Sequence, residues 1–374
     1  MNASSLLKTR PAYVTRKGSS YIGDSLELLS SMPDESIDLV VTSPPFALQR
    51  KKEYGNKDQH EYVAWLGEFA KAIYPKLKET GSFVLDIGGA YKKGVPVRSL
   101  YNYRVPLHIC DDVGYHLAED FYWFNPSKLP SPIEWVNKRK IRAKDSVNNV
   151  WWFAKSPFPK ADVSKVLSPY SDRMKKLLKD PEKYYSPKDR PSGHSIGKSF
   201  SSDNGGAIPS NLLQIPNSES NSSYLAHCKL SGVKGHPARF PAKLPEFFIK
   251  FLTDPGDVVV DIFAGSNTTG SVCESLDRRW LSFDLDAEYV AASAFRFLPK
   301  TASEKQLLYL YHTIQARETV DLVEMQVSPP NGLSPRTRHY VAGRSEEYAK
   351  SDRLNKNQRR AQEIINRTHE VFTL

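Results

Sequence analysis

The chain has 374 residues, which is enough for about two domains of ordinary size. Hydrophobic residues make up 40% of it, so a sizeable core is possible and a disordered chain or a small disulfide-stapled scaffold is excluded. The net charge of +10 favours an anionic partner, and nucleic acid is the first candidate.

The cysteines are too few and too scattered for a disulfide framework or a CxxC metal site, because Cys110, Cys228 and Cys273 stand alone. We expect inert thiols in a reducing compartment and no bound metal. No apolar run of signal-peptide or membrane-spanning length is present. The sequence therefore predicts a cytoplasmic protein that does not contact membranes.

Short apolar runs alternate with segments of helical periodicity. Strands are predicted at 37–41, 82–86, 258–263 and 280–284, and helices at about 60–78 and 287–298. This alternation predicts an α/β fold with a mainly parallel sheet and helices on both faces. Ligands of such folds bind beyond the carboxyl ends of the strands.

The middle of the chain differs in composition. From about Asn125 to Gly235 it is rich in Lys, Arg, Ser, Asn and Pro, which is typical of loops or a mobile insertion. After about Pro299, a Pro/Gly/Ser-rich stretch at 328–334 precedes a charged segment with a helical pattern.

The first predicted strand runs directly into Thr42-Ser43-Pro44-Pro45-Phe46. Each proline fixes its own φ and restricts the residue before it, so the loop is stiff. Its carbonyls can orient the hydrogens of an exocyclic amino group, the Ser43 hydroxyl adds a polar contact, and Phe46 offers a face on which a base can stack. On this motif alone, an ordinary strand-ending turn explains the residues equally well.

A glycine-containing segment, Asp261 to Gly270, follows another predicted strand and precedes a predicted helix. Gly265 lets the turn pass close beneath a ligand, and the N–H groups at the helix start can bind an anionic group. Asp284 ends the next strand, where it can accept hydrogen bonds from ribose hydroxyls. The pattern suits a ligand with an adenosine and an anionic end, and a plain β–α turn with solvated acids is about as good an explanation.

Taken together, these motifs resemble those of amino-group DNA methyltransferases. Ser43-Pro44-Pro45-Phe46 is similar to their catalytic motif, Asp261 to Gly270 to their S-adenosylmethionine loop, and His236-Pro237-Ala238-Arg239-Phe240-Pro241 to the segment before that loop. The order of the motifs is that of the permuted β class, and serine at position 43 points to cytosine N4 rather than adenine N6. The resemblance covers roughly residues 10 to 300.

The resemblance implies a Rossmann-like S-adenosylmethionine-dependent methyltransferase fold with circularly permuted motifs. It implies a catalytic half at 10–125, a target-recognition and DNA-binding region at 126–235 and a cofactor-binding half at 236–300. The charged extension at 301–374 receives no role.

The implied reaction is direct methyl transfer to an amine without a covalent enzyme adduct. A cytosine-C5 methyltransferase needs a Pro-Cys nucleophile, whereas Ile109, His227 and Val272 precede the three cysteines here. The residues expected to act on the base are Ser43, Pro44, Pro45, Phe46 and Asp86. Asp86 would accept the proton by its match to the family, and a plain strand-end carboxylate is nearly as good an explanation.

The residues that the resemblance assigns to the cofactor are Gly23, Asp24, His236, Asp261, Phe263, Gly265, Ser266, Asn267, Thr268 and Asp284. Asn267 stands where a third glycine is common in the family. For Gly23 and Asp24 a plain turn remains an equal alternative. The basic cluster Lys138, Arg139, Lys140 and Arg142 is the candidate DNA-binding surface, with a solvated basic face as the alternative.

The expected function is site-specific methylation of cytosine N4 in double-stranded DNA, implied to be the inner cytosine of CAGCTG. This would protect host DNA from a restriction endonuclease, with no physical contact required between the two enzymes. The alternatives are adenine-N6 methylation, a catalytically silent DNA-binding regulator and, more weakly, RNA methylation.

Overall fold

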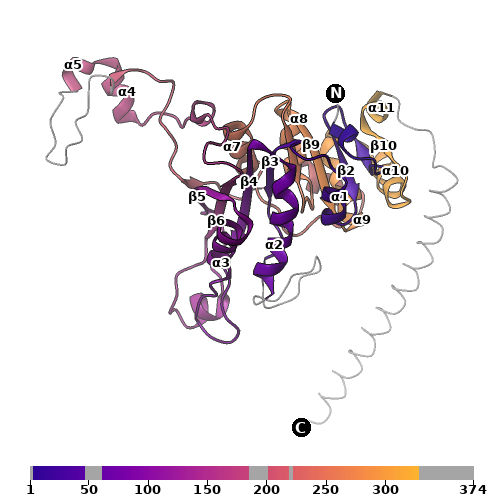
Figure 1. The fold of residues 1–374 in the computed structure, drawn as a ribbon, viewed down its shortest axis with the longest axis horizontal. Helices are drawn as coiled ribbons and strands as arrows, with labels where there is room; N and C mark the ends of the chain where they lie inside the picture. The colour runs from indigo at the N-terminus through magenta and orange to yellow at the C-terminus, as the bar shows by residue number, and fades with distance from the viewer. Residues whose placement is uncertain (1–2, 47–60, 185–200, 219–221, 328–374) are drawn as a thin grey trace, which may run out of the picture.

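One ten-stranded sheet organises the molecule (Figure 1). The computed structural model describes residues 3–46, 61–184, 201–218 and 222–327. The sheet order is β10-β1-β2-β9-β8-β3-β4-β6-β5-β7. The strands are β1 (Tyr13–Val14), β2 (Gly18–Ile22), β3 (Ile37–Thr42), β4 (Leu77–Gly88), β5 (His116–Phe124), β6 (Val147–Ala154), β7 (Leu212–Gln214), β8 (Val258–Asp261), β9 (Arg279–Asp284) and β10 (Val320–Asp321).

The five central strands, β2, β9, β8, β3 and β4, are mutually parallel, so their carboxyl ends meet at one edge of the sheet. Antiparallel pairing occurs only further out among the described strands, where β6 joins β4 to β5 and β1 pairs with β2. The predicted mainly parallel α/β fold is confirmed.

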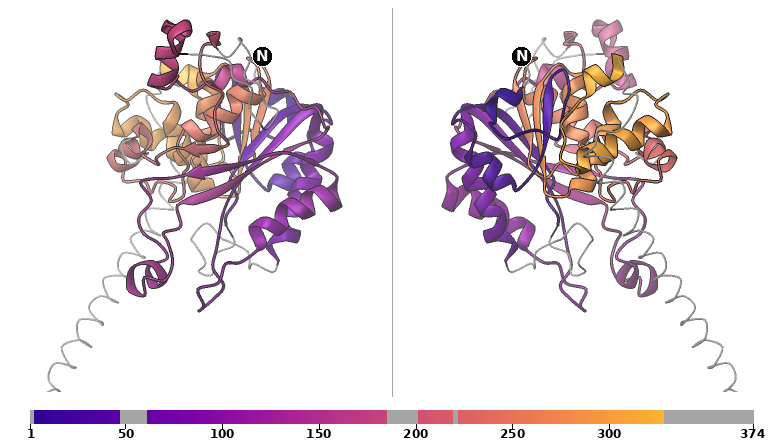
Figure 2. Two further views of the ribbon diagram at one scale, coloured as in Figure 1. Left: turned by 90° about the vertical axis from the view of Figure 1, so that its left-hand side faces the viewer. Right: turned by 90° about the vertical axis from the view of Figure 1, so that its right-hand side faces the viewer.

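Helices cover both faces of the sheet, as the two side views in Figure 2 show. One face carries α1 (Ser25–Ser30), α2 (Tyr62–Ile73) and α3 (Tyr101–His108), and the other carries α6 (Ser223–Leu230), α7 (Lys243–Leu252), α8 (Thr268–Ser275), α9 (Ala287–Ser293) and α10 (Glu304–Gln315). The remaining helices are α4 (Asp172–Lys179) and α5 (Pro181–Tyr184), which project from the body, and α11 (Leu322–Val327). None of the helices in these described ranges has the length and apolarity needed to cross a membrane.

Burial on two faces explains why the central strands are apolar without alternation. In β3, Ile37 and Val40 pack under α1 and α2, while Leu39 and Val41 pack toward α7. Parallel strands covered by helices on both sides have this pattern.

The predicted strands correspond to β3, β4, β8 and β9, but the helix predicted at about 60–78 ends earlier. α2 ends at Ile73, Tyr74–Lys76 form a 3₁₀ turn, and Leu77 already begins β4. Pro75 accounts for the early end, because proline lacks the N–H that would continue the helical ladder.

The middle of the chain is not simply a loop-rich insertion. β6 lies inside the sheet between β4 and β5, β7 forms one edge, and α6 contributes Tyr224 and Cys228 to the core. Beyond residue 300, α10 packs on α9, and β10 pairs with β1 at the opposite edge. The charged segment after residue 327 lies outside the described residues.

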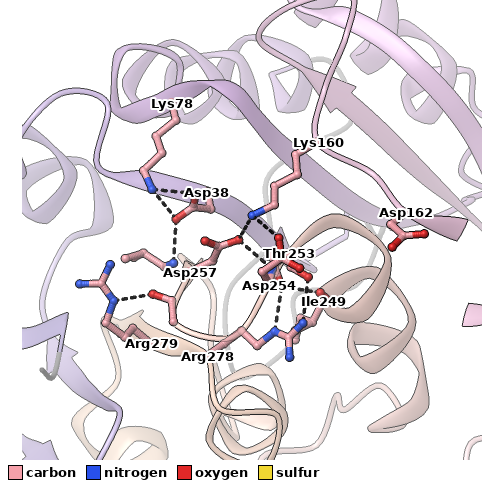
Figure 3. A network of polar contacts seen from close by, with 12 residues as sticks. Asp38, Lys78, Lys160, Asp162, Ile249, Thr253, Asp254, Asp257, Arg278 and Arg279 are labelled. Atoms are coloured by element: carbon pink, nitrogen blue, oxygen red, sulfur yellow. Dashed lines mark hydrogen bonds and ion pairs between the residues drawn. The ribbon is translucent and has the colours of Figure 1, made fainter. Parts of the chain in front are cut away.

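A polar network holds the sheet together at the amino ends of its central strands (Figure 3). Asp38 of β3 accepts hydrogen bonds from Lys78 Nζ at 2.8 and 2.9 Å and from the main-chain N of Val258 at 2.8 Å. Nearby, Lys160 Nζ pairs with Asp257 at 2.6 Å. These contacts fix the register of β3, β4 and β8 at the end of the sheet that is remote from their carboxyl termini.

Candidate active site

A cavity of about 1230 Å³ opens at the carboxyl ends of the central strands. Ligand cavities are commonly about 300–1,000 Å³, so there is room for a cofactor and part of a second substrate. The predicted site residues that line it are Asp24, Ser43, Pro44, Pro45, Phe46, Asp86, His236, Phe263, Gly265, Ser266, Thr268 and Asp284. Motifs more than 200 positions apart in the sequence therefore share one wall.

The proline loop leaves β3 beside the end of β4. Thr42 pairs with Leu85 in the parallel ladder, which places Ser43 next to Asp86. Ser43 Oγ donates a hydrogen bond to Asp86 Oδ2 at 3.0 Å. The Phe46 ring lies over Gly88, where a Cβ would approach Phe46 Cε2 to 2.5 Å. A glycine at position 88 is therefore what lets this ring lie against the strand end.

The Asp86 carboxyl is buried, with 5% of its surface exposed. Burial raises its pKa to about 6, and hydrogen bonds from Asn148 and Ser43 and the positive charge of Lys128 lower that pKa in part. The carboxylate is consequently ionised above about pH 6, and it can accept a proton at neutral pH.

The glycine loop after β8 is fixed to the end of β9. Gly265 has φ +49°, a conformation that favours glycine, and its main-chain N donates to Asp284 Oδ2 at 2.8 Å. A Cβ at Gly265 would lie 3.0–3.1 Å from the His236 ring. Burial raises the Asp284 pKa to about 6, and hydrogen bonds from the N–H groups of Asp286 and Gly265 lower it in part.

His236 forms an uncharged wall of the cavity. Burial lowers its pKa to about 4, so the imidazole is neutral at physiological pH. Its Nδ1 is 2.6 Å from the Ala238 carbonyl oxygen, and its ring meets Tyr289 edge-on with centroids 4.4 Å apart. Its main-chain N donates to the Tyr224 hydroxyl at 2.9 Å.

Three residues predicted to bind the cofactor lie behind the cavity wall instead of lining it. Asp261 is buried and accepts hydrogen bonds from Thr42 Oγ1 at 2.7 Å and Thr269 Oγ1 at 2.6 Å. Asn267, at φ 53°, caps α8 through the Gly270 N–H and donates to the Tyr13 hydroxyl at 2.8 Å. The main-chain N of Gly23 donates to the Asp284 carbonyl at 3.0 Å. All three hold the surrounding loops in place.

The predicted basic cluster is exposed and does not line the cavity. Lys138 and Arg139 pair with Glu134 at 3.3 and 3.0 Å. Arg142 Nη2 donates to the Pro96 carbonyl at 2.8 Å. These contacts lie within the protein and do not test DNA binding, which stays a prediction for the cluster Lys138, Arg139, Lys140 and Arg142. Within the described ranges no group of three or more His, Cys, Asp or Glu residues is arranged to hold a metal ion.

Comparison with known proteins identifies the family. A family model described as DNA methylase matches residues 37–295. The chain belongs to the DNA methylase family. It is 69% identical over 313 residues to the type II methyltransferase M.PvuII of Proteus hauseri, covering 84% of this chain and 93% of that protein.

A solved structure described as the PvuII DNA methyltransferase (cytosine-N4-specific) superposes on this DNA methylase with a TM-score of 0.70 and 59% identity. The match covers 84% of this chain and 99% of that one. The type II methyltransferase M.BglII of Bacillus subtilis is 26% identical over 270 residues, 72% of this chain and 66% of that protein.

The cavity fits S-adenosylmethionine, the cofactor of this DNA methylase. Gly265 leaves open the space that a Cβ would occupy, and Asp284 presents a carboxylate at the end of β9. The hydroxyl-bearing residues Ser266 and Thr268 line the same wall. An adenosine with an attached amino-acid chain needs acceptors for its ribose hydroxyls and a protein backbone that comes close to the ligand.

Sequence reasoning missed several residues that line the cavity of this DNA methylase. Trp65 and Phe69 of α2 pack on Phe263, with ring centroids 5.6 and 4.9 Å apart. Their spacing predicted the helix but gave no indication that one end of its apolar face reaches a ligand cavity. Lys128 and Asn148 were also missed. The signal for Asn148 was an asparagine pair at the start of an apolar run, 147–154, that was not recognised as a strand.

Proposed function

We propose that this DNA methylase transfers a methyl group from S-adenosylmethionine to N4 of cytosine in duplex DNA. The observation that carries the proposal is the Ser43–Asp86 hydrogen bond in the wall of the cavity that also contains Gly265 and Asp284. Serine at position 43 and the cytosine-N4-specific relative at 59% identity support cytosine over adenine.

S-adenosylmethionine supplies a methyl group on a positively charged sulfur, which leaves with the electron pair of the broken carbon–sulfur bond. The cytosine amine forms the new carbon–nitrogen bond with its lone pair, and that lone pair is a weak nucleophile because the ring withdraws it. The Ser43 hydroxyl oxygen and the Pro44 carbonyl would accept hydrogen bonds from the two amine N–H groups and so orient the lone pair. Positioning of this kind can lower a barrier by several kcal/mol.

Methylation leaves the amine with one proton too many. The amine N–H would bond to Ser43 Oγ, whose own hydrogen is directed at Asp86 Oδ2. The amine proton would pass to Ser43 as the Ser43 proton passes to Asp86, so charge and protons balance. Asp86 can act in this way because its pKa, raised by burial to about 6, leaves it ionised near neutral pH.

The target amine lies inside the double helix, so the base must leave the stack at a cost of a few kcal/mol. Phe46 lines the cavity beside Ser43 and offers a flat apolar face. Stacking on an aromatic ring of this kind recovers about 1–3 kcal/mol per base.

On the cofactor side, Asp284 would accept hydrogen bonds from the ribose hydroxyls. Gly265, Ser266 and Thr268 would surround the amino-acid end, with Phe263 and the neutral His236 as uncharged walls and Asp24 near the adenine. Asp261, Asn267 and Gly23 would act indirectly, by holding the loops that carry these groups.

We further propose that residues 126–235 contain the target-recognition region, between a catalytic half at 10–125 and a cofactor-binding half at 236–300. Lys138, Arg139, Lys140 and Arg142 would contact phosphates, and Lys128 at the cavity would lie near the flipped nucleotide. High identity to M.PvuII supports CAGCTG as the target, with the inner cytosine methylated. The partner would be a restriction endonuclease of the same specificity, with no direct contact required.

Mapping modified bases in a bacterial genome that expresses the protein tests the proposal. We expect N4-methylcytosine at the inner cytosine of CAGCTG and resistance of that DNA to an endonuclease that cuts CAGCTG. N6-methyladenine in its place would establish the alternative reaction. If the genome contains no modified base although the protein is expressed and folded, the result would favour a catalytically silent DNA-binding regulator.

A further inference from the structure

A second side chain donates a hydrogen bond to the Asp86 carboxylate, in addition to Ser43. Asn148 of β6 directs its Nδ2 at the Asp86 carboxylate, 3.1 Å from Oδ1 and 3.5 Å from Oδ2. β6 runs antiparallel to β4, with Asn148 opposite Gly88 and Val150 opposite Asp86. Asn148 and Asp86 are therefore diagonal neighbours on one face of the sheet, within side-chain reach.

We propose that Asn148 is a positioning residue that holds the Asp86 carboxylate in the orientation and charge state in which it accepts a proton from Ser43. The inference rests on the proposed function and adds a residue to its proton pathway. Asp86 lies in β4 and Ser43 directly follows the neighbouring β3, so rotation of the carboxylate would break the hydrogen bond between them.

The orientation argument follows from the side-chain torsion of aspartate. The carboxylate plane turns over a broad range, so one donor does not fix it. Asp86 receives Ser43 from the β3 side and Asn148 from the β6 side, on strands that flank β4 on either side. Two donors that approach from opposite sides of β4 define the plane and keep Oδ2 within hydrogen-bond distance of Ser43.

The charge argument follows from burial. Burial raises the Asp86 pKa to about 6, and the Asn148 hydrogen bond is the largest of the influences that lower it, ahead of Ser43 and the charge of Lys128. The Tyr62 phenol of α2, whose pKa burial raises well above its usual value, also interacts with Asp86, and the Tyr101 phenol of α3 donates to the carbonyl of Gly88, two residues further along β4. Removing Asn148 would therefore take away the largest of these influences and leave a carboxyl that stays protonated to higher pH, although Ser43 and Lys128 would still lower its pKa.

The next residue on β6 offers a matched control. Asn149 is buried to the same extent as Asn148, each with 8% of its surface exposed. Its Oδ1 accepts a hydrogen bond from Asn102 Nδ2 at 2.9 Å, and its side chain does not line the cavity. Loss of the buried side-chain hydrogen bond at Asn149 thus reproduces the cost in folding stability without removing a contact to Asp86.

The test is the pH profile of kcat/KM for methyl transfer to duplex DNA, which reports ionisations of the free enzyme. We expect the acid limb of Asn148→Leu to move up by about one pH unit relative to wild type, which by itself lowers kcat/KM about twofold at pH 7 and about tenfold at pH 5. Asn149→Leu should keep the wild-type midpoint. Asn148→Asp, which keeps the side-chain shape, should move the limb further up because two carboxylates then share one site.

A double variant shows whether Asn148 acts through Asp86. In an Asp86→Asn background, Asn148→Leu should cause little further loss, because the group it positions has been removed.

A wild-type midpoint in both Asn148→Leu and Asn148→Asp would overturn the proposal, as would equal shifts in Asn148→Leu and Asn149→Leu. If Asn148→Leu does not fold, Asn148→Asp decides. If the wild-type protein forms N4-methylcytosine and the variants keep the wild-type pH profile of kcat/KM, this inference alone is refuted. If the wild-type protein methylates nothing, the proposed function is refuted as well.

Discussion

Asp284 Oδ2 accepts a hydrogen bond from the main-chain N of Gly265 at 2.8 Å, which ties the end of β9 to the loop that follows β8. The same carboxylate also receives the Asp286 N–H at 3.0 Å on Oδ1. Two main-chain donors thus orient a half-buried acid at the cavity wall, where it can still accept from a ligand. The cofactor end of the cavity is preformed by this contact.

Asp284→Ala should weaken S-adenosylmethionine binding by about tenfold or more, because hydrogen bonds to charged groups are worth about 1.5–3 kcal/mol each. Calorimetric titration with the cofactor measures the change. Asp277→Ala is the matched control, since Asp277 precedes the other end of β9 and is exposed. Unchanged affinity in a folded Asp284→Ala protein would remove Asp284 from the binding site.

Gly265→Ala should weaken cofactor binding through both strain and crowding. Alanine at position 265 would have to adopt φ +49°, and its Cβ would lie 3.0–3.1 Å from the His236 ring. Gly256→Ala separates the two effects, because Gly256 has φ +89° with nothing within 4 Å of a Cβ. We expect both variants to lose about 1 kcal/mol or more of stability and only Gly265→Ala to lose cofactor affinity. Equal affinities in the two variants would contradict a close approach at Gly265.

Ser43→Ala should lower the methyl-transfer rate by about 10²-fold or more while leaving cofactor affinity close to that of wild type. The hydroxyl donates to Asp86, and in the proposed reaction it would receive the proton of the target amine, whereas the cofactor is assigned to the Gly265 loop. Single-turnover transfer to duplex DNA and calorimetry with the cofactor provide the two readouts. A folded Ser43→Ala protein that transfers normally would exclude Ser43 from the proton pathway.

Asp86→Asn should stabilise the folded protein at high pH while strongly lowering, but not eliminating, transfer. The folded-state pKa is raised by burial to about 6, above the value of 3.8 expected in the unfolded chain, so the folded state holds the extra proton between these values. The stability that this proton contributes is complete below about pH 4 and is lost as the pH rises through about 6. Asp86→Asn avoids the loss, so its gain in unfolding free energy should be about 3 kcal/mol at pH 8 and close to zero near pH 4. Thermal unfolding at several pH values measures this, and a constant difference between the two proteins would contradict it.

The sequence was informative where chemistry and local conformation coincide. The proline loop at Ser43 and the glycine turn at Gly265 each follow a mostly apolar strand, and parallel pairing brings such strand ends together. Their meeting in one cavity could therefore be expected from the pattern alone. The family of the chain could be recognised from the same residues.

Other parts depend on packing that local patterns do not encode. Asn267 occupies a position where glycine is common, but its side chain caps α8 and bonds Tyr13, a residue 254 positions away. Asp261 ends its strand as Asp284 does, yet two threonine hydroxyls occupy its carboxylate. Asn148 reaches Asp86 because β6 enters the sheet from a region whose composition indicated loops. In each case the partner lies far away in the sequence.

The most direct test of the account is the fate of a labelled methyl group. The protein is incubated with S-adenosylmethionine labelled in its methyl carbon and a duplex containing CAGCTG, and the DNA is digested to nucleosides and separated. The account predicts label in N4-methylcytosine with wild-type protein and almost none with Ser43→Ala. Label in N6-methyladenine or C5-methylcytosine, or equal incorporation by the two proteins, would contradict it.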